Sequence, residues 1–224
     1  MTEHAALVNG EAIARTRVDA FLKTHGPATP LRGAGNCATS HNEPAAARRQ
    51  TEAPSAARQR RRWATQVVVT DELARRACAD RGLEPPTEAP PAKLLTVPEA
   101  DVADLGSIVA AALANSPAAR LLLSALEAEQ TVAETAVRDY YDRNPDRFLT
   151  PEALRRGVDP FGGATHTDFL PYEAAREGIA RELRRAAGRQ AFFDWLDQAR
   201  TGVEYAHGHE HPGDPTHPDH EHRH

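Results

Sequence analysis

Prolines divide this chain into short helical segments, and their positions constrain the fold more than any other feature of the sequence. The stretch LEPPTEAPPAK, residues 83–93, has four prolines in eleven residues. It cannot be helical, because proline lacks the amide hydrogen and its ring collides with the preceding turn. Further breaks end helical patterns at Gly26-Pro27, Asn115-Ser116-Pro117 and Asn144-Pro145. We therefore expect separate helices, with loops or linkers at 27–42 and 83–97.

Between these breaks, apolar residues recur at three- and four-residue spacing, which is typical of a helix with one buried face. The spacing predicts helices that begin at Glu11, Glu43, Pro98, Pro117 and Pro171. Thr70 resembles a helix start, so the segment 43–82 is either two helices or one helix with a bend. Ser116 is placed to cap the helix that begins at Pro117. No strand alternation is convincing, so the predicted fold class is all-α.

Composition narrows the class of protein. The net charge is −5, and a protein that binds nucleic acid would need a clustered basic excess. No run approaches the roughly twenty apolar residues of a membrane span, and the first residues lack the apolar region of a secretory signal. Two cysteines do not make a disulfide framework. We expect a cytoplasmic protein with reduced thiols and with neither nucleic acid nor a membrane as partner.

The C-terminal stretch HGHEHPGDPTHPDHEHRH, residues 207–224, is rich in histidine. In an extended chain, side chains two residues apart point to the same side, so this spacing gives two groups of three imidazoles. Neutral imidazole suits Zn, Ni and Cu. The segment 204–224 is thus either a disordered metal-binding tail or a polar end that binds metal only as any His-rich tract does. The candidate ligands are His207, His209, His211, His217, His220, His222 and His224.

Large aromatic side chains on the predicted helices are candidates for a surface that holds apolar peptide, since such surfaces bind without strong sequence demands. Residues at helical spacing are more often core, and that interpretation stays open for them. The candidate peptide-binding residues are Phe21, Trp63, Tyr140, Tyr141, Phe193 and Trp195.

Three stretches, residues 6–22, 137–155 and 170–200, together resemble the helical, peptide-holding part of the parvulin-type prolyl isomerase and SurA-like chaperone family. The first is similar to the short strand, Asn-Gly turn and helix that open that fold. The second is similar to the tyrosine-rich helix and Asn-Pro stop that precede the catalytic domain. The resemblance implies a helical N-terminal region over 1–150, completed by a helix at 170–203 that packs on the N-terminal helices.

The chain departs from that family where the catalytic parvulin domain would stand. Only the short linker 151–169 lies there, whereas an independent domain needs at least roughly fifty residues. The resemblance therefore implies a non-catalytic chaperone-like or adaptor protein that holds an apolar peptide segment or a client protein, without catalytic residues. Two alternatives stay open: a divergent peptidyl-prolyl cis-trans isomerase, and an accessory protein that delivers the metal bound by its tail.

Overall fold

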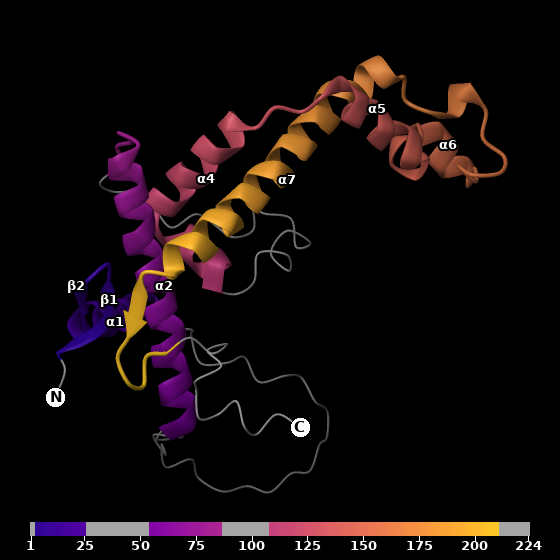
Figure 1. Ribbon diagram of the computed structural model, residues 1–224. Coiled ribbons are helices and arrows are strands. Elements are labelled where there is room, and N and C mark those ends of the chain that lie inside the picture. The colour runs from indigo at the N-terminus through magenta and orange to yellow at the C-terminus, as the bar shows by residue number, and fades with distance from the viewer. Residues whose placement is uncertain (1–2, 26–53, 87–107, 211–224) are drawn as a thin grey trace, which may run out of the picture. The chain divides into compact units, whose positions relative to one another are not determined.

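The computed structural model describes residues 3–25, 54–86 and 108–210, so the predicted loop 27–42 and most of the predicted loop 83–97 lie outside it. The described chain is mostly helical, with a small three-stranded antiparallel sheet (Figure 1). The helical part of the predicted fold class is confirmed, and the sheet corrects the prediction of an all-α fold. Two compact units form, one from the chain up to Ala119 together with the chain from Ala199 on, and the other from Arg120–Gln198. We call them unit 1 and unit 2.

A hairpin opens unit 1. Strand β1, His4–Val8, pairs with β2, Glu11–Ala14, and Val8 lies opposite Glu11. Asn9 and Gly10 join the strands with φ angles of 51° and 82°, the left-handed conformation of a two-residue hairpin turn. Helix α1, Arg15–His25, begins where β2 ends, so the predicted helix start at Glu11 is wrong by four residues. The turn returns the chain to β1 before a helix can start.

The end of the described chain closes the same sheet. Strand β3, Val203–Tyr205, runs antiparallel to β1 on the side opposite β2. Backbone hydrogen bonds of 2.9 Å from Asn9 to Gly202 and from Ala206 to Ala5 extend the pairing. The sequence predicted a disordered tail from residue 204, but residues 204–210 belong to β3 and the turn after it.

Helix α2, Pro54–Asp80, crosses unit 1 without interruption. The Thr70 hydroxyl donates 2.8 Å to the Gln66 carbonyl one turn earlier, so Thr70 is an interior residue of a helix and does not start one. All seven residues from Ala64 to Thr70 are buried, which means that neighbouring chain covers every face of the helix there. Helix α2 therefore forms the centre of the core of unit 1.

The helix Ile108–Asn115 precedes α4, Pro117–Glu129. The Ser116 hydroxyl accepts a hydrogen bond of 3.0 Å from the Ala119 amide, so the predicted cap and the predicted start at Pro117 are confirmed. Among the described residues, no single helix is long and apolar enough to span a membrane, although these two pass that test when counted together across their bend.

Unit 2 is built around helix α7, Tyr172–Arg200. Helix α7 starts within one residue of the predicted position. A small apolar core forms beside it from Val137, Phe148, Tyr172 and Ile179. The other elements of unit 2 are most of α4, α5 (Glu134–Arg143), the 3-10 turn Pro145–Phe148, α6 (Pro151–Arg156) and the 3-10 turn His166–Asp168.

The nineteen residues 151–169, expected as a linker, form a folded excursion with a closed base. Leu149 and Phe169 pair as an antiparallel bridge, and the Thr150 amide donates 2.7 Å to the Asp168 carbonyl. The Thr150 hydroxyl caps α6, and Gly157, at φ 67°, ends it. The excursion therefore begins and ends at neighbouring positions within unit 2.

Candidate functional site

Unit 1 contains a pocket of about 120 Å³ between α1, α2 and the end of the helix Ile108–Asn115. Its apolar wall comes from Phe21 of α1 and from Val67 and Val68, which are buried in the middle of α2. The other described residues that line it are Arg17, Asp71, Arg75, Asn115 and Ser116. An apolar cavity with a few polar groups at its edge is the usual form of a small binding site.

Ion pairs fix α1 against α2 beside this pocket. Arg17 donates 2.8 Å to Asp71 and 2.6 Å to Glu72. Burial opposes the charge of Arg17, but its hydrogen bonds and attraction to Glu72 and Asp71 outweigh this and raise the pKa of Arg17. Burial likewise opposes the charge of Glu72, yet its bonds to Arg17 and Arg76 lower the pKa of Glu72. Both groups are therefore charged at neutral pH and hold the two helices in register.

Arg75 stands at the mouth of the pocket with a side chain that is 59% exposed. It pairs with Asp71 four residues earlier at 2.9 Å, a surface pair of a kind that contributes about 0.3–0.5 kcal/mol. The lining holds two guanidinium groups and one carboxylate, and Glu72, bonded to Arg17, balances the second guanidinium. The side chain of Arg75 is the more exposed of the two cations.

Two of the six candidate peptide-binding aromatics meet at the pocket. Phe21 lines it, and the ring of Trp63 lies 5.8 Å from the ring of Phe21 between centroids. Both side chains are half-buried, as expected for residues at the edge of a core. Trp63 is therefore an optical reporter next to the site.

Tyr140 and Tyr141 lie in unit 2, where both hydroxyls already have partners. Tyr140 donates 2.9 Å to Glu182, and Tyr141 donates 2.5 Å to the carbonyl of Leu170. The Tyr141 ring stacks on Phe148 at 4.8 Å between centroids. This pair therefore contributes to the internal packing of unit 2, which is the core interpretation that the sequence left open.

Phe193 and Trp195 are half-buried near the other end of α7. The Trp195 ring packs 5.2 Å from Phe192, which is buried. Tyr141 packs against Tyr172 at the start of α7, and a helix rises 1.5 Å per residue, so Phe193 is roughly 30 Å further along. The tyrosine pair and the Phe193–Trp195 pair do not form one continuous surface within unit 2.

The histidine-rich end begins on a packed turn. His209 is buried, and its Nδ1 lies 2.8 Å from the Thr65 hydroxyl of α2. Burial, with the positive charges of Arg15 and Arg61, lowers the pKa of His209 to about 4, although Glu210 and Asp19 act in the opposite direction. This imidazole is therefore neutral at physiological pH and serves as an anchor for the end of the chain.

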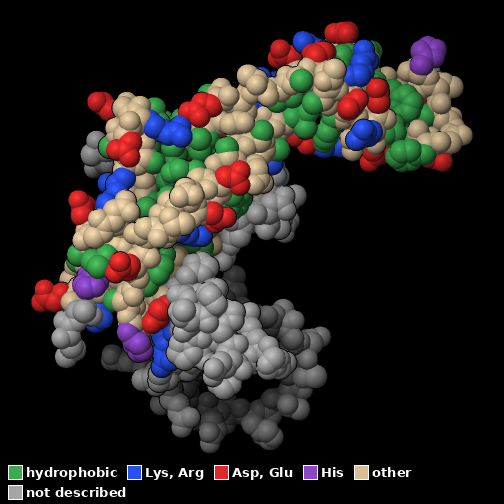
Figure 2. All heavy atoms as spheres, viewed as in Figure 1, with side chains coloured by type: hydrophobic (Ala, Val, Ile, Leu, Met, Phe, Trp, Pro, Cys, Tyr) green, Lys and Arg blue, Asp and Glu red, His purple; other side chains and the backbone are tan. Residues whose placement is uncertain are grey.

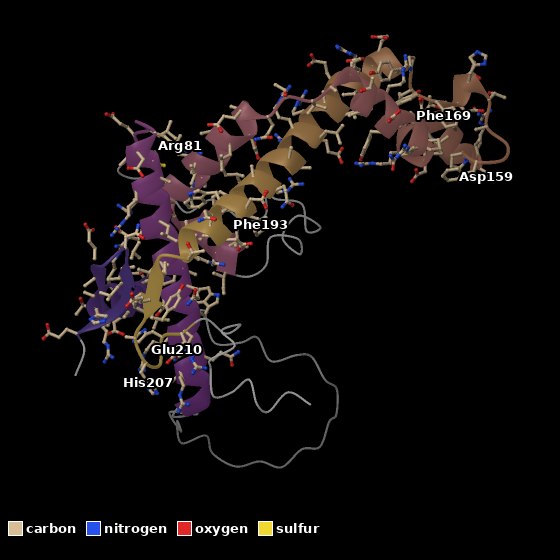
Figure 3. The ribbon with its side chains drawn as sticks, in the orientation of Figure 1. Arg81, Asp159, Phe169, Phe193, His207 and Glu210 are labelled. Atoms are coloured by element: carbon tan, nitrogen blue, oxygen red, sulfur yellow. The ribbon has the colours of Figure 1, made fainter. Side chains whose placement is uncertain are left out.

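This packing changes the first of the two predicted histidine groups. Gly208 has a φ of 85°, so the segment turns where the prediction required an extended chain. His207 is exposed while His209 is buried. Figure 3 labels His207 and Glu210, which flank this turn beside α2. In the described part of the chain, no three His, Cys, Asp or Glu side chains gather to hold a metal ion. The other candidate ligands, His211, His217, His220, His222 and His224, lie outside the described residues.

Sequence reasoning missed a polar stripe inside the buried part of α2. Gln66 is fully buried and accepts a hydrogen bond of 2.9 Å from the Tyr205 hydroxyl of β3, next to the Thr65–His209 contact. Together these contacts fix the end of the described chain on α2. The signal was present as two polar residues at the head of the run TQVVVT, where an apolar residue would be expected in a buried helix.

Unit 2 exposes large hydrophobic side chains in one stretch of the sequence. Among the described residues these are Leu154, Phe161 and Leu170, with exposed fractions of 59%, 73% and 38%. Hydrophobic side chains are visible on the surface at the end of unit 2 that holds α6 (Figure 2). Side chains of this kind are candidates for contact with another molecule.

Comparisons with known proteins found no relative of this chain. No family model, no curated protein and no solved structure matches the chain. The pocket, the aromatic pair beside it and the exposed side chains of unit 2 therefore carry the functional argument.

Proposed function

We propose that this chain is a non-catalytic holding protein, chaperone-like or an adaptor, that binds an apolar peptide segment through the pocket of unit 1. The pocket itself carries the proposal, because Phe21, Val67 and Val68 form an apolar wall beside a charged mouth. An engineered apolar cavity of about 150 Å³ takes a benzene molecule. At about 120 Å³, this pocket has room for one side chain of the size of leucine or proline.

The closed base of the 151–169 excursion supports the non-catalytic part of the proposal. Leu149 and Phe169 are paired, so no further chain enters between them, and the nineteen residues they enclose are too few for a domain. The resemblance of residues 6–22, 137–155 and 170–200 to the SurA-like holding region supports the same assignment.

The proposal predicts that apolar peptide changes the fluorescence of Trp63. The chain has two tryptophans, so Trp195→Phe leaves Trp63 as the single reporter, 5.8 Å from the pocket residue Phe21. Titration with a capped peptide that has one central leucine is expected to give a saturable change in emission. Phe21→Ala in the same background should weaken binding about tenfold, equivalent to about 1.4 kcal/mol, because one wall of the pocket is lost.

Leu22→Ala is the matched control for this titration, because Leu22 is the neighbouring half-buried residue of α1 and does not line the pocket. It should leave the affinity unchanged. Equal weakening by the two substitutions, or no response of Trp63 to peptide, would count against the pocket. If the purified protein accelerates cis-trans isomerisation of a proline peptide, the divergent isomerase is the better assignment.

Metal binding by the histidine-rich tail is a separate prediction, and the structure sharpens its test. Because His209 packs on Thr65, a truncation should remove residues 211–224 and keep everything through Glu210. Calorimetry with Ni²⁺, Zn²⁺ or Cu²⁺ at pH 7.5 is expected to show binding by the full chain and little by the truncated one. An unchanged isotherm would refute the tail assignment. Loss of cellular function on truncation, with peptide binding intact, would instead support metal delivery.

A further inference from the structure

Phe161 is the most exposed large hydrophobic residue among those described, with 73% of its surface accessible. It stands in the turn after α6, where Asp159 fixes the backbone. The Phe161 amide donates 2.9 Å to the Asp159 side chain, and the Gly163 amide donates 3.1 Å to the Asp159 carbonyl. An aspartate turn of this type holds its central residues in a defined conformation. The ring is thus presented to solvent on a fixed turn.

The turn 159–163 exposes Asp159, Phe161, Gly162 and Gly163. A side chain at Gly163 would meet no atom within 4 Å, whereas a Cβ at Gly162 would lie 2.9 Å from Asp159 Oδ2, so the carboxylate folds back over the turn. Asp159, which is labelled in Figure 3, is exposed and precedes Phe161 by two residues. The turn therefore presents a phenyl ring and one negative charge to solvent.

These features complement the pocket of unit 1. Its wall of Phe21, Val67 and Val68 is apolar, and a cavity of about 120 Å³ is close to the roughly 150 Å³ that takes a benzene ring. At its edge the Arg75 side chain is 59% exposed, and its positive charge is opposite in sign to that of the exposed Asp159 carboxylate. Matched charges at the edge of an apolar contact favour association and fix its orientation.

We infer that the Phe161 ring of one copy of this chain occupies the unit 1 pocket of a second copy, with Asp159 of the first copy against Arg75 of the second. This inference rests on the proposed function, because it uses the same pocket. The Phe161 ring would fill that pocket when no client peptide is bound. Two different surfaces meet in this contact, so a reciprocal pair closes a dimer, while an unreciprocated contact continues into longer assemblies. Self-association and peptide holding then compete for the same pocket.

Sedimentation equilibrium of the full chain tests the inference over micromolar concentrations. Wild-type protein should associate reversibly, and Phe161→Ser should weaken association about 30-fold, because burial of the ring supplies most of the contact. Leu154→Ser is the matched control, since Leu154 is also exposed in unit 2 but lies on α6. It should associate like the wild type. A monomeric wild type at 100 µM, or equal weakening by both substitutions, would overturn the inference.

Asp159→Asn tests the role of charge while it keeps the turn, because the asparagine oxygen can accept the same hydrogen bond from the Phe161 amide. Association should weaken about threefold and lose most of its salt dependence. An excess of the peptide VDPFGG, residues 158–163, should dissociate the wild-type assembly and change Trp63 emission. Failure of the peptide to dissociate it would contradict the inference.

The outcomes separate this inference from the proposed function. If Phe161→Ser does not change self-association, the second copy is not the occupant, and the leucine-peptide titration still decides the pocket. If Phe161→Ser weakens self-association, the same variant should bind leucine peptide at least as tightly as the wild type, because the competing ring is gone. Tighter self-association of Phe161→Ser would also refute the inference.

Discussion

Gly188→Ala is expected to destabilise the protein by about 3 kcal/mol, because α4 lies against α7 at this residue without room for a side chain. A Cβ atom at Gly188 would lie 2.3 Å from Glu127 Cγ and 2.7 Å from Glu127 Cα. The second contact is with the backbone, so a change of side-chain rotamer does not relieve it. Thermal unfolding should show a midpoint about 10 °C lower than that of the wild type.

Gly178→Ala is the control on the same helix. A Cβ at Gly178 meets nothing within 4 Å, and alanine favours a helix over glycine by about 0.8–1 kcal/mol. This variant should therefore unfold at a slightly higher temperature than the wild type. Similar midpoints for the two variants would show that the close approach of α4 and α7 does not limit stability.

Acid is expected to weaken the protein in a window set by His209. A histidine in the unfolded chain has a pKa of about 6.5, whereas burial and the charges of Arg15 and Arg61 lower the folded pKa to about 4. Below pH 6.5 the unfolded chain binds a proton that the folded chain excludes, so stability falls until the pH reaches about 4. The full shift corresponds to about 3 kcal/mol, and screening by solvent reduces the expected loss to about 2 kcal/mol.

Urea titrations at several pH values measure this loss. His209→Leu should flatten the pH dependence of the unfolding free energy between pH 6.5 and 4. His166→Gln, at an exposed position, should keep that dependence. Glu134 acts in a different range: its hydrogen bond to Arg176 is the first cause that lowers its pKa, to about 2, so the stability it contributes is lost only below about pH 4.5. The same slope in the wild type and His209→Leu would remove His209 as the cause.

Proline-containing breaks in the sequence predicted two helix boundaries correctly. Ser116 caps the helix that begins at Pro117, and α5 ends at Arg143 before Asn144-Pro145, as the turn chemistry of these residues requires. The opening hairpin was missed although Asn9-Gly10 was recognised as a turn. Its strands are four and five residues long and rich in alanine, so they lack the β-branched alternation that identifies a strand.

Contacts between residues far apart in the sequence were the main features that the sequence did not predict. Pairing of β3 with β1 joins residues about two hundred positions apart, and no local pattern encodes it. That return places His209 against Thr65, so a histidine that the spacing marked as a metal ligand is an anchor. Phe21 and Trp63 were named as candidates because large aromatics are visible in any sequence, and the structure places them next to each other beside the pocket. Arg17 and Arg75 were not, since a charged residue on a helix usually indicates a solvated face.

The bridge between Leu149 and Phe169 makes unit 2 tolerant of replacement at this point. The two ends of the excursion lie side by side. If a larger folded module replaces the residues between them, the entropy of loop closure changes only slowly with the added length, and the flanking hydrogen bonds stay in place. A fluorescent or enzymatic cargo with adjacent termini can accordingly be grafted there.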